Sequence, residues 1–356
     1  MTQATALRRG WTTGSCATAA AKAAWALLMI DDCPDPVTIT LPGGGEAAFS
    51  LDGSGRNGDT AWARVVKDAG DDPDVTHGAL ITVTVARAST GSGIIFRAGS
   101  GVGTITQPGL PLPPGEPAIN PVPRKMIRTA LEQITPGAAD AIVTISIADG
   151  EELAKRTLNA RLGILGGLSV LGTTGIVIPY SCSAWIHSIH RGVDVARALN
   201  LPHIAGSTGS TSEKSIRSLY TLPDPALIEM GDFAGGFLKY LHRHPVPRLT
   251  IAGGLAKMTK LAQGHLDLHS SRTLADPQAL APIAAPLGLT DAQLYRLAKA
   301  QTIAQGYTAL GDDRLGSLIA QRAAETARDT LADPECRLDV VIFDRQGALI
   351  GRSTLL

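Results

Sequence analysis

Cysteine, net charge and long apolar runs are all scarce in this sequence. Its four cysteines lie far apart among 356 residues and form no C-x-x-C pair. That spacing argues against a disulfide-stapled secreted domain and favours a reduced, cytoplasmic protein. Thirty-two basic residues balance 32 acidic ones, which argues against a nucleic-acid partner bound through a net basic field.

The longest mostly apolar run, residues 17–30, is interrupted by Lys22 and followed by two aspartates. We interpret it as too short and too polar to span a membrane, so no membrane partner is expected. Arg8 and Arg9 precede it, as in an export signal, but no unbroken apolar stretch or cleavage site follows. With 44% hydrophobic residues the chain can bury a sizeable core, and its length predicts two domains.

Short runs of apolar residues, some alternating with polar ones, predict strands in the first half of the chain. The clearest is ALITVTVAR, residues 79–87. Further strands are expected at 37–41, 46–51, 60–67, 93–99 and 141–149, with helices at 16–29, 124–134 and 151–162. This part therefore predicts a strand-rich α+β domain.

The pattern changes near residue 185. A helix is expected at 184–199, and apolar runs at 203–207, 226–232, 248–254 and 338–344 alternate with helical stretches. Short apolar strands between helices are typical of βαβ units and a parallel sheet. We therefore predict an α/β (α+β) protein with two unlike domains, residues 1–185 and residues 186–356.

The segment KDAGDDPDVTHG, residues 67–78, concentrates carboxylates and an imidazole. Crowding raises carboxylate pKa values, so Asp68, Asp72 and His77 are candidates for a catalytic acid or base. The same side chains could hold a hard cation, although the spacing lacks the twelve-residue calcium-loop pattern that ends in Glu. A solvated acidic turn is the structural alternative.

Two later segments offer glycines and basic residues. GSGVGTITQPGL, residues 99–110, contains Gly101, Gly103 and Thr104, and glycine permits close backbone approach to a flat or anionic ligand. Arg124 and Lys125 stand at a predicted helix start, where positive charge gains nothing from the helix dipole. Such cations make sense if they face ligand carboxylates, and solvated charges are the alternative.

Glycine-bearing turns follow three predicted parallel strands in the second half. The carboxyl ends of parallel strands meet at one edge of a sheet, where ligands of open α/β sheets bind. An acidic residue about twenty positions beyond the first turn can bind ribose hydroxyls. These features predict a nucleoside-type ligand, and polar, capped βα turns are the alternative. The candidates are Gly206, Thr208, Gly209, Ser212, Glu229, Gly231, Asp232, Gly253 and Gly254, and Lys257 and Lys260 either face an anionic group or are solvated.

No protein-bound metal is predicted. His265 and His269 are four residues apart, but HLDLH lacks the Glu of H-E-x-x-H. Two histidines without a clear third ligand are more often structural or solvated. Cys16, near a predicted helix start, could have a lowered thiol pKa. It has no identifiable base partner, so a packing role is favoured.

Five segments occur in this order along the chain: RRGWTTGSCATAAAKAA, VVKDAGDDPDVTHG, GSGVGTITQPGL, GEPAINPVPRKMI and EMGDFAGG. Together they strongly resemble the cobalt-precorrin-5B C1-methyltransferase family, the CbiD family, of cobalamin biosynthesis. The resemblance runs from about residue 9 to about residue 270, and LDVVIFD near the C-terminus fits it as well.

The resemblance implies an enzyme that uses S-adenosylmethionine to methylate C1 of cobalt-precorrin-5B, giving cobalt-precorrin-6A and S-adenosylhomocysteine. It also implies a permuted N-terminal domain like domain 2 of ribosomal protein S5 and a Rossmann-like C-terminal domain with a small parallel sheet. We then expect the second domain to bind S-adenosylmethionine and the first to bind the tetrapyrrole substrate. Cobalt would arrive within that substrate.

Several alternatives stay open at this point. The same methylation could act on a metal-free precorrin, and a tetrapyrrole-binding carrier would need no methyl donor. A nucleotide-dependent phosphotransferase is disfavoured, because Walker A and kinase motifs are missing. The sequence does not decide the oligomeric state, and a homo-oligomer is among the options.

Overall fold

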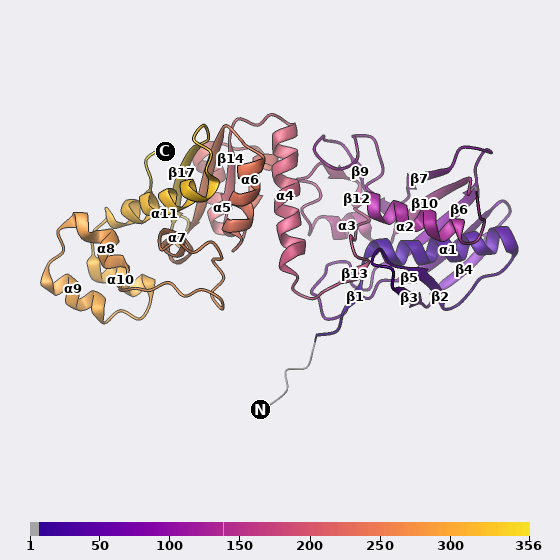
Figure 1. Ribbon diagram of the computed structural model, residues 1–356, viewed down its shortest axis with the longest axis horizontal. Coiled ribbons are helices and arrows are strands. Elements are labelled where there is room, and N and C mark those ends of the chain that lie inside the picture. Colours follow the sequence, from indigo (N-terminus) through magenta and orange to yellow (C-terminus); the bar gives the residue numbers. More distant parts are fainter. Residues whose placement is uncertain (1–6, 138) are drawn as a thin grey trace, which may run out of the picture. The chain divides into compact units, whose positions relative to one another are not determined.

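The computed structural model describes residues 7–137 and 139–356, which fold into two compact units (Figure 1). The first unit ends at Cys182, and the second comprises Ser183–Leu356. Each unit has its own apolar core. Both combine helices with sheets, which confirms an α/β protein at this coarse level.

A sheet with the strand order β4-β5-β6-β10-β7 forms the centre of the first unit. Neighbouring strands are antiparallel except β10 and β7, which are parallel. Buried and less buried residues alternate along β5, β6 and β10, as expected for strands with one face on a core. The bounds are Gly53–Asn57 (β4), Thr60–Val66 (β5), Leu80–Arg87 (β6), Ala141–Ile147 (β10) and Ile94–Ala98 (β7).

Helix α1, Thr13–Ile30, packs on this sheet, and α2, Pro121–Glu132, packs beside α1. Thr12 caps α1 by accepting a hydrogen bond from the Ser15 N–H at 3.2 Å. By length and composition α1 could cross a membrane, so the expectation that this stretch is too short and too polar for a span is wrong. Its alanines and Trp25 are buried, however, and α1 is the core helix of the unit.

Short strand pairs complete the first unit and bring distant segments together. Residues 101–105 lie beside residues 164–168, because β8 pairs with β12 and β9 with β11. The bounds are Gly10–Trp11 (β1) with Ile176–Val177 (β13), Val37–Thr40 (β2) with Glu46–Phe49 (β3), Gly101–Val102 (β8) with Gly167–Leu168 (β12), and Thr104–Ile105 (β9) with Ile164–Leu165 (β11).

One helix and one strand of the central sheet in the first unit differ from the predictions. The helix expected at 151–162 is only α3, Gly150–Ala154. The residues after it form turns, in which the Asn159 side chain donates to the Gly167 carbonyl at 3.2 Å, and such side-chain bonds compete with helix. The apolar patterns also do not predict β4, because its sequence GSGRN has no apolar side chain. Pairing with β5 makes it a strand.

The second unit is built on a sheet with the order β15-β14-β16-β17-β18. As predicted, β15, β14, β16 and β17 are parallel, whereas β18 is antiparallel to β17. The bounds are Ile204–Ser207 (β14), Leu227–Glu229 (β15), Arg248–Gly254 (β16), Arg337–Phe343 (β17) and Leu349–Arg352 (β18).

Helices cover both faces of this second sheet. Helix α5 packs on one face, and α4, α6, α7 and α11 pack on the other. Strands β14 and β17 are buried almost throughout, as a sheet covered on both faces requires. The bounds are Cys182–Ala198 (α4), Ser210–Tyr220 (α5), Ala234–Arg243 (α6), Leu255–Ala262 (α7), Leu280–Ala284 (α8), Asp291–Ala298 (α9), Ile303–Leu310 (α10) and Leu315–Leu331 (α11).

The strand order of the second sheet reverses at β14. The chain passes from β14 to β15 on one side and then returns to β16 on the other. Helices α5 and α7, which follow β14 and β16, lie on opposite faces. Open α/β sheets bind ligands beyond the carboxyl ends of their strands at such a switch point. The turns after β14, β15 and β16, here called the carboxyl edge, are therefore the candidate ligand site of this unit.

Candidate functional site

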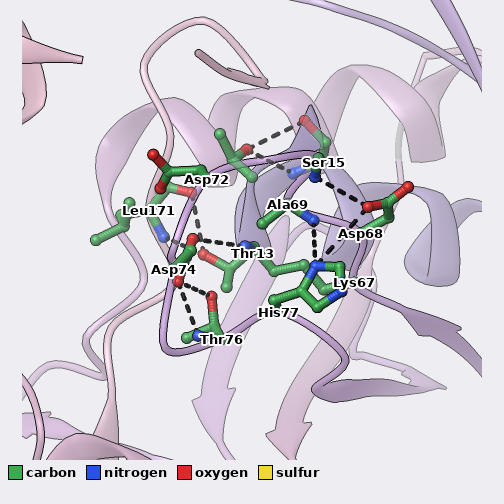
Figure 2. Close-up of polar contacts among 12 residues, drawn as sticks. Thr13, Ser15, Lys67, Asp68, Ala69, Asp72, Asp74, Thr76, His77 and Leu171 are labelled. Carbon is green, nitrogen blue, oxygen red and sulfur yellow. Dashed lines mark hydrogen bonds and ion pairs between the residues drawn. The ribbon is translucent and has the colours of Figure 1, made fainter. Parts of the chain in front are cut away.

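The acidic loop, residues 67–78, contains a buried ion pair (Figure 2). Lys67 Nζ lies 2.6 Å from Asp74 Oδ2, and the Lys67 side chain is 1% exposed. The other Asp74 oxygen accepts from the N–H and the hydroxyl of Thr76 at 2.8 and 2.6 Å. Burial acts to raise the pKa of Asp74, but the Lys67 ammonium and these hydrogen bonds outweigh it and lower the pKa. This pair holds the loop in place.

A second cation faces Asp68 in the same loop. Both terminal nitrogens of the Arg8 guanidinium contact its carboxylate, and the Gly70 N–H donates to it at 2.9 Å. The hydrogen bond from Arg8, followed by that from Gly70, lowers the pKa of Asp68 to about 2. The expectation that crowding raises these carboxyl pKa values is therefore wrong for Asp68 and Asp74, because a cation faces each of them. So low a pKa makes Asp68 a weak proton acceptor at neutral pH.

His77 and Asp72 lie in different surroundings within the acidic loop. The His77 Nδ1 atom accepts from the Ala69 N–H at 3.1 Å and lies 3.8 Å from an Asp68 oxygen. With Nδ1 as acceptor, the proton of the neutral ring is on Nε2, and the side chain is 53% exposed. Asp72 instead accepts from the Tyr180 N–H at 2.8 Å. The structure thus brings Asp68 and His77 together, while Asp72 binds a separate backbone segment.

The acidic loop packs against the segment that leads into α1. The Trp11 N–H donates to the Asp68 carbonyl at 2.7 Å. Beside it, Thr13 and Leu171 exchange hydrogen bonds at 3.1 and 3.0 Å. The segments RRGWTTGSC and KDAGDDPDVTHG, which are far apart in sequence, therefore form one region of the first unit. Cys16 is buried here, and burial raises its thiol pKa to about 12, which favours packing over nucleophilic chemistry.

Gly101 and Gly103 pack against the protein itself. A Cβ atom at Gly101, where φ is +75°, would lie 2.0 Å from the Ile147 carbonyl oxygen. At Gly103 it would lie 2.6 Å from the Ile164 side chain. Both glycines are needed for close packing of the short strand pairs, so the space expected to admit a ligand is filled there. Thr104 begins β9 and is partly buried.

Arg124 and Lys125 have different environments at the start of α2. Arg124 donates to the Ile119 and Pro117 carbonyls, at 2.8 and 3.1 Å, and pairs with Glu116 at 2.8 Å. Its side chain is 13% exposed, so these contacts account for a cation at this end of the helix. They fasten the preceding segment to α2. Lys125 is exposed and is free to face a ligand carboxylate.

In the second unit, the residues after β14 combine open space with a buried polar atom. Ser207 Oγ is buried and has no hydrogen-bond partner within the described part of the chain. Such unpartnered buried groups are uncommon. Beside it, a Cβ atom placed on Gly209 would meet nothing within 4 Å beyond its chain neighbours. The end of β14 therefore has room, and a polar atom, for a ligand.

Gly206 and Ser212 serve the fold of the same segment. A Cβ atom at Gly206 would lie 2.3 Å from the Phe237 ring, so only glycine fits beside α6. The Ser212 hydroxyl donates to the Gly209 carbonyl at 2.8 Å, in the first turn of α5. Both residues are buried, whereas Gly209 is partly exposed.

The turns after β15 and β16 meet the end of β14. The Gly231 N–H donates to the Ser207 carbonyl at 3.2 Å, and the Thr208 N–H donates to the Ala252 carbonyl at 3.0 Å. A Cβ atom at Gly253 would lie 2.9 Å from Thr208 Oγ1. The structure thus gathers most of the predicted ligand residues at one edge: Thr208, Gly209, Gly231, Asp232, Gly253 and Gly254, with Glu229 at the end of the edge strand β15.

Asp232 and Lys257 form an ion pair at the carboxyl edge. Lys257 Nζ lies 3.0 Å from Asp232 Oδ1 and donates to the Thr208 carbonyl at 2.8 Å. Lys260, by contrast, is buried and donates to the Leu268 carbonyl at 2.8 Å. Of the two lysines that follow β16, Lys257 is therefore the one that a ligand can reach.

An open groove of about 450 Å³ lies elsewhere in the second unit, between α5 and the turn from β17 to β18. None of the predicted ligand residues lines it. The carboxyl edge, and not this groove, is the candidate ligand site, because it has the strand topology and the polar groups that bind ligands in open α/β sheets. The groove residues are Lys214, Ser215, Ser218, Leu219, Phe343, Gly347 and Leu349.

Across residues 7–137 and 139–356, no group of three or more His, Cys, Asp or Glu side chains is arranged to hold a metal ion. His269 instead hydrogen-bonds to the Ser271 hydroxyl at 2.7 Å. His190 stacks on Tyr240, with ring centres 3.8 Å apart. These histidines have structural partners.

The chain matches known proteins along nearly its whole length. The CbiD family model matches residues 1–179, and the model of the CbiD C-terminal domain matches residues 267–354. A relative from Agrobacterium fabrum named cobalt-precorrin-5B C(1)-methyltransferase is 59% identical, covering 98% of this chain and 93% of its own. Relatives of the same name from Bradyrhizobium sp. and Paramagnetospirillum magneticum are 60% and 56% identical, covering 97% of this chain and 93% and 98% of their own.

The chain belongs to the CbiD family.

A crystal structure described as a cobalamin biosynthesis protein (cbiD) from Archaeoglobus fulgidus is 29% identical, with a TM-score of 0.41. It covers 75% of this chain, which covers 83% of it. In this CbiD protein, residues 180–266 lie between the two family-model matches. They carry the turns after β14, β15 and β16.

Sequence patterns do not single out Ser207, Lys67 or the pairing of Arg8 with Asp68 in this CbiD protein. A signal exists for two of them. Ser207 ends an apolar run before a glycine-bearing turn, and Lys67 stands between a strand and an acid-rich loop. The pairing of Arg8 with Asp68 has no local signal, because 60 positions separate the two residues.

Proposed function

We propose that this CbiD protein is an S-adenosylmethionine-dependent enzyme that methylates C1 of cobalt-precorrin-5B in cobalamin biosynthesis. The main support for this proposal is that relatives 56–60% identical over nearly the whole chain are all named cobalt-precorrin-5B C(1)-methyltransferase. The products are cobalt-precorrin-6A and S-adenosylhomocysteine. We place the enzyme in the cytoplasm, with cobalt entering as part of the substrate.

The second unit is proposed to be a Rossmann-like domain that binds the methyl donor. Support comes from the parallel strand order with its reversal at β14. The buried Ser207 hydroxyl and the open space at Gly209 fit a ligand with polar groups. S-adenosylmethionine offers hydroxyl, amino and carboxylate groups to such a site. Glu229, at the end of β15, is the candidate partner of the ribose hydroxyls.

The first unit is proposed to be the permuted S5-like domain that binds the tetrapyrrole. Lys125 is its exposed candidate for a substrate carboxylate, since a carboxylate and an ammonium form a charge-assisted hydrogen bond. Arg124, Gly101 and Gly103 shape the surrounding framework through their internal contacts. Thr104 belongs to the same framework.

Methyl transfer forms a carbon–carbon bond at C1 and breaks the bond between methyl and sulfur, whose electron pair returns to sulfur. The sulfonium is already activated, so the protein mainly supplies position. Correct positioning of two reactants can account for about 7–11 kcal/mol of barrier lowering. An acid or base adds about 10²- to 10⁴-fold where a macrocycle proton must leave or shift.

Within the acidic loop, His77 is the side chain best suited to that proton transfer. Its exposed ring is oriented by the Ala69 N–H and lies next to Asp68. We expect His77→Gln to slow single-turnover methylation by about 10²-fold, with smaller losses for Asp68→Asn and Asp72→Asn. Exposed Asp59→Asn is the control. Near-wild-type rates for all three loop variants would remove the acidic loop from the mechanism.

The function is tested by incubating the protein with methyl-labelled donor and purified cobalt-precorrin-5B, then locating the label. Label at C1 of the macrocycle is the expected result, and no transfer to the macrocycle would contradict the proposal. A parallel incubation with the metal-free precursor decides whether cobalt is required. A carrier without catalysis would bind the corrinoid but not S-adenosylmethionine, so a donor titration separates it from the enzyme.

A further inference from the structure

One lysine connects the turns that follow three parallel strands of the second unit. Lys257 stands in the first turn of α7, directly after β16. Its ammonium contacts the Thr208 carbonyl after β14 and the Asp232 carboxylate after β15. An ion pair therefore lies at the point where the strand order reverses, which is where open α/β sheets bind their ligands.

This pair differs from the buried ion pair of the first unit. The side chains of Lys257 and Asp232 are 36% and 22% exposed, whereas Lys67 is 1% exposed. A lysine ammonium has three N–H donors, and Lys257 has two oxygen partners within the described residues. A further N–H donor of Lys257 is thus left for a ligand.

We propose that the Lys257–Asp232 pair binds the amino-acid end of the methyl donor, an inference that rests on the proposed function. That end is a zwitterion with one carboxylate and one ammonium, which match a lysine and an aspartate held side by side. Lys257 receives the donor carboxylate, and Asp232 receives the donor ammonium, each through a charge-assisted hydrogen bond. The open space at Gly209 and the unpartnered Ser207 hydroxyl lie on the same edge, where the nucleoside end can be placed.

The rival interpretation is that the pair merely ties three turns together. A structural tie would affect every ligand of the carboxyl edge alike when it is removed. A zwitterion site affects only ligands that carry the amino-acid group. The two interpretations therefore differ in ligand dependence.

The test uses calorimetric titration of the full chain with three ligands: S-adenosylmethionine, S-adenosylhomocysteine and 5′-methylthioadenosine. The last keeps the nucleoside and the sulfur but has no amino-acid group. Lys257→Met and Asp232→Asn should weaken binding of the first two ligands by about 10- to 100-fold, the value of one lost charged hydrogen bond. Binding of 5′-methylthioadenosine should stay as in the unaltered protein. The matched control is Lys239→Met, an exposed lysine on α6, which should change none of the three affinities.

An equal loss of affinity for all three ligands would overturn the proposal in favour of a structural tie, and so would unchanged affinity for all three. If the unaltered protein binds none of them, the donor assignment itself is wrong. If it binds them but the variants show no ligand dependence, only this inference is wrong. Should Lys257→Met not fold, Lys257→Gln replaces it, because the amide keeps a polar side chain at this position but carries no charge. The same ligand dependence is then expected.

Discussion

The acidic loop of the first unit and the carboxyl edge of the second unit are both rich in polar residues, but their polar groups are used differently. In the acidic loop, Lys67 and Arg8 neutralise Asp74 and Asp68. At the carboxyl edge, Ser207 keeps a buried hydroxyl without a hydrogen-bond partner within the described residues, and the Lys257 ammonium is accessible. Most polar groups of the acidic loop are already bound by other groups of the protein, whereas the carboxyl edge has polar groups that can bind a ligand.

The comparison shows that a dense cluster of acids is weak evidence for acid–base chemistry. Four aspartates and one histidine within twelve residues suggest acid–base chemistry, yet the aspartates are paired with cations or backbone N–H groups. Pairing lowers the pKa values of Asp68 and Asp74 and reduces the use of these two carboxylates as bases. Glycine-bearing turns after parallel strands are harder to notice in a sequence. They are nevertheless better evidence for a ligand site, because the topology of a parallel sheet places these turns side by side.

The largest effect is expected for Lys67→Met, which tests whether the acidic loop is held by its buried pair. Removing a buried charge partner leaves Asp74 uncompensated, so the free energy of unfolding should fall by about 3 kcal/mol. Urea denaturation followed by circular dichroism measures it. The control is Lys155→Met, which breaks an exposed pair with Glu152 and should cost less than about 1 kcal/mol. Equal losses for the two variants would mean that the loop does not depend on this pair.

A smaller effect is expected for Gly206→Ala, which tests the space at the carboxyl edge. Its methyl group would overlap the buried Phe237 ring, so the free energy of unfolding should fall by about 1–3 kcal/mol. Gly209→Ala is the matched variant, three residues later, where the methyl group meets nothing. It should cost less than about 1 kcal/mol as a helix N-cap change. If both variants are equally destabilised, Gly209 is not open.

The smallest effect is expected for Asp68→Asn and concerns pH. The pKa of Asp68 is lowered from 3.8 to about 2 in the folded protein. The carboxylate therefore contributes stability above about pH 4, and this contribution is lost as the pH falls towards 2. Asp68→Asn should flatten the stability profile between pH 4 and pH 2. At neutral pH the loss should be small, because both Asp68 and Arg8 are exposed. A profile as steep as that of the unaltered protein would show that the Arg8 contact is not formed in solution.

Most strands and helices could be predicted because their apolar patterns are local. The run RLTIAGG coincides with β16, and ALITVTVAR contains β6. The failures are elements without such a pattern. The edge strand β4 depends on β5 for its hydrogen bonds. The residues that follow the short α3 form turns, in which the Asn159 side chain binds the backbone of Gly167. Neither cause can be read from the residues of the element alone.

The candidate site was less predictable than the fold, because exposure and pairing are tertiary properties. Arg124 looked available for a ligand, but Glu116 and two carbonyl oxygens occupy it. Gly101 looked like a place for ligand approach, but backbone fills that space. Lys257 is one of two lysines after a glycine-bearing turn. Only the tertiary structure shows that Lys257 is accessible and that Lys260 is buried.

The sequence by itself determined the two kinds of sheet, the parallel strands of the second half and the family, since apolar spacing and contiguous motifs depend only on the order of residues. Tertiary structure alone decided which polar groups are bound by other groups of the protein and which are accessible to a ligand. The physical reason is that a charge or hydroxyl finds its partner through space: Arg8 meets Asp68 across 60 positions, and Lys257 meets Thr208 across 49. Those contacts, rather than residue type, separate a closed acidic loop from an edge with room for a ligand.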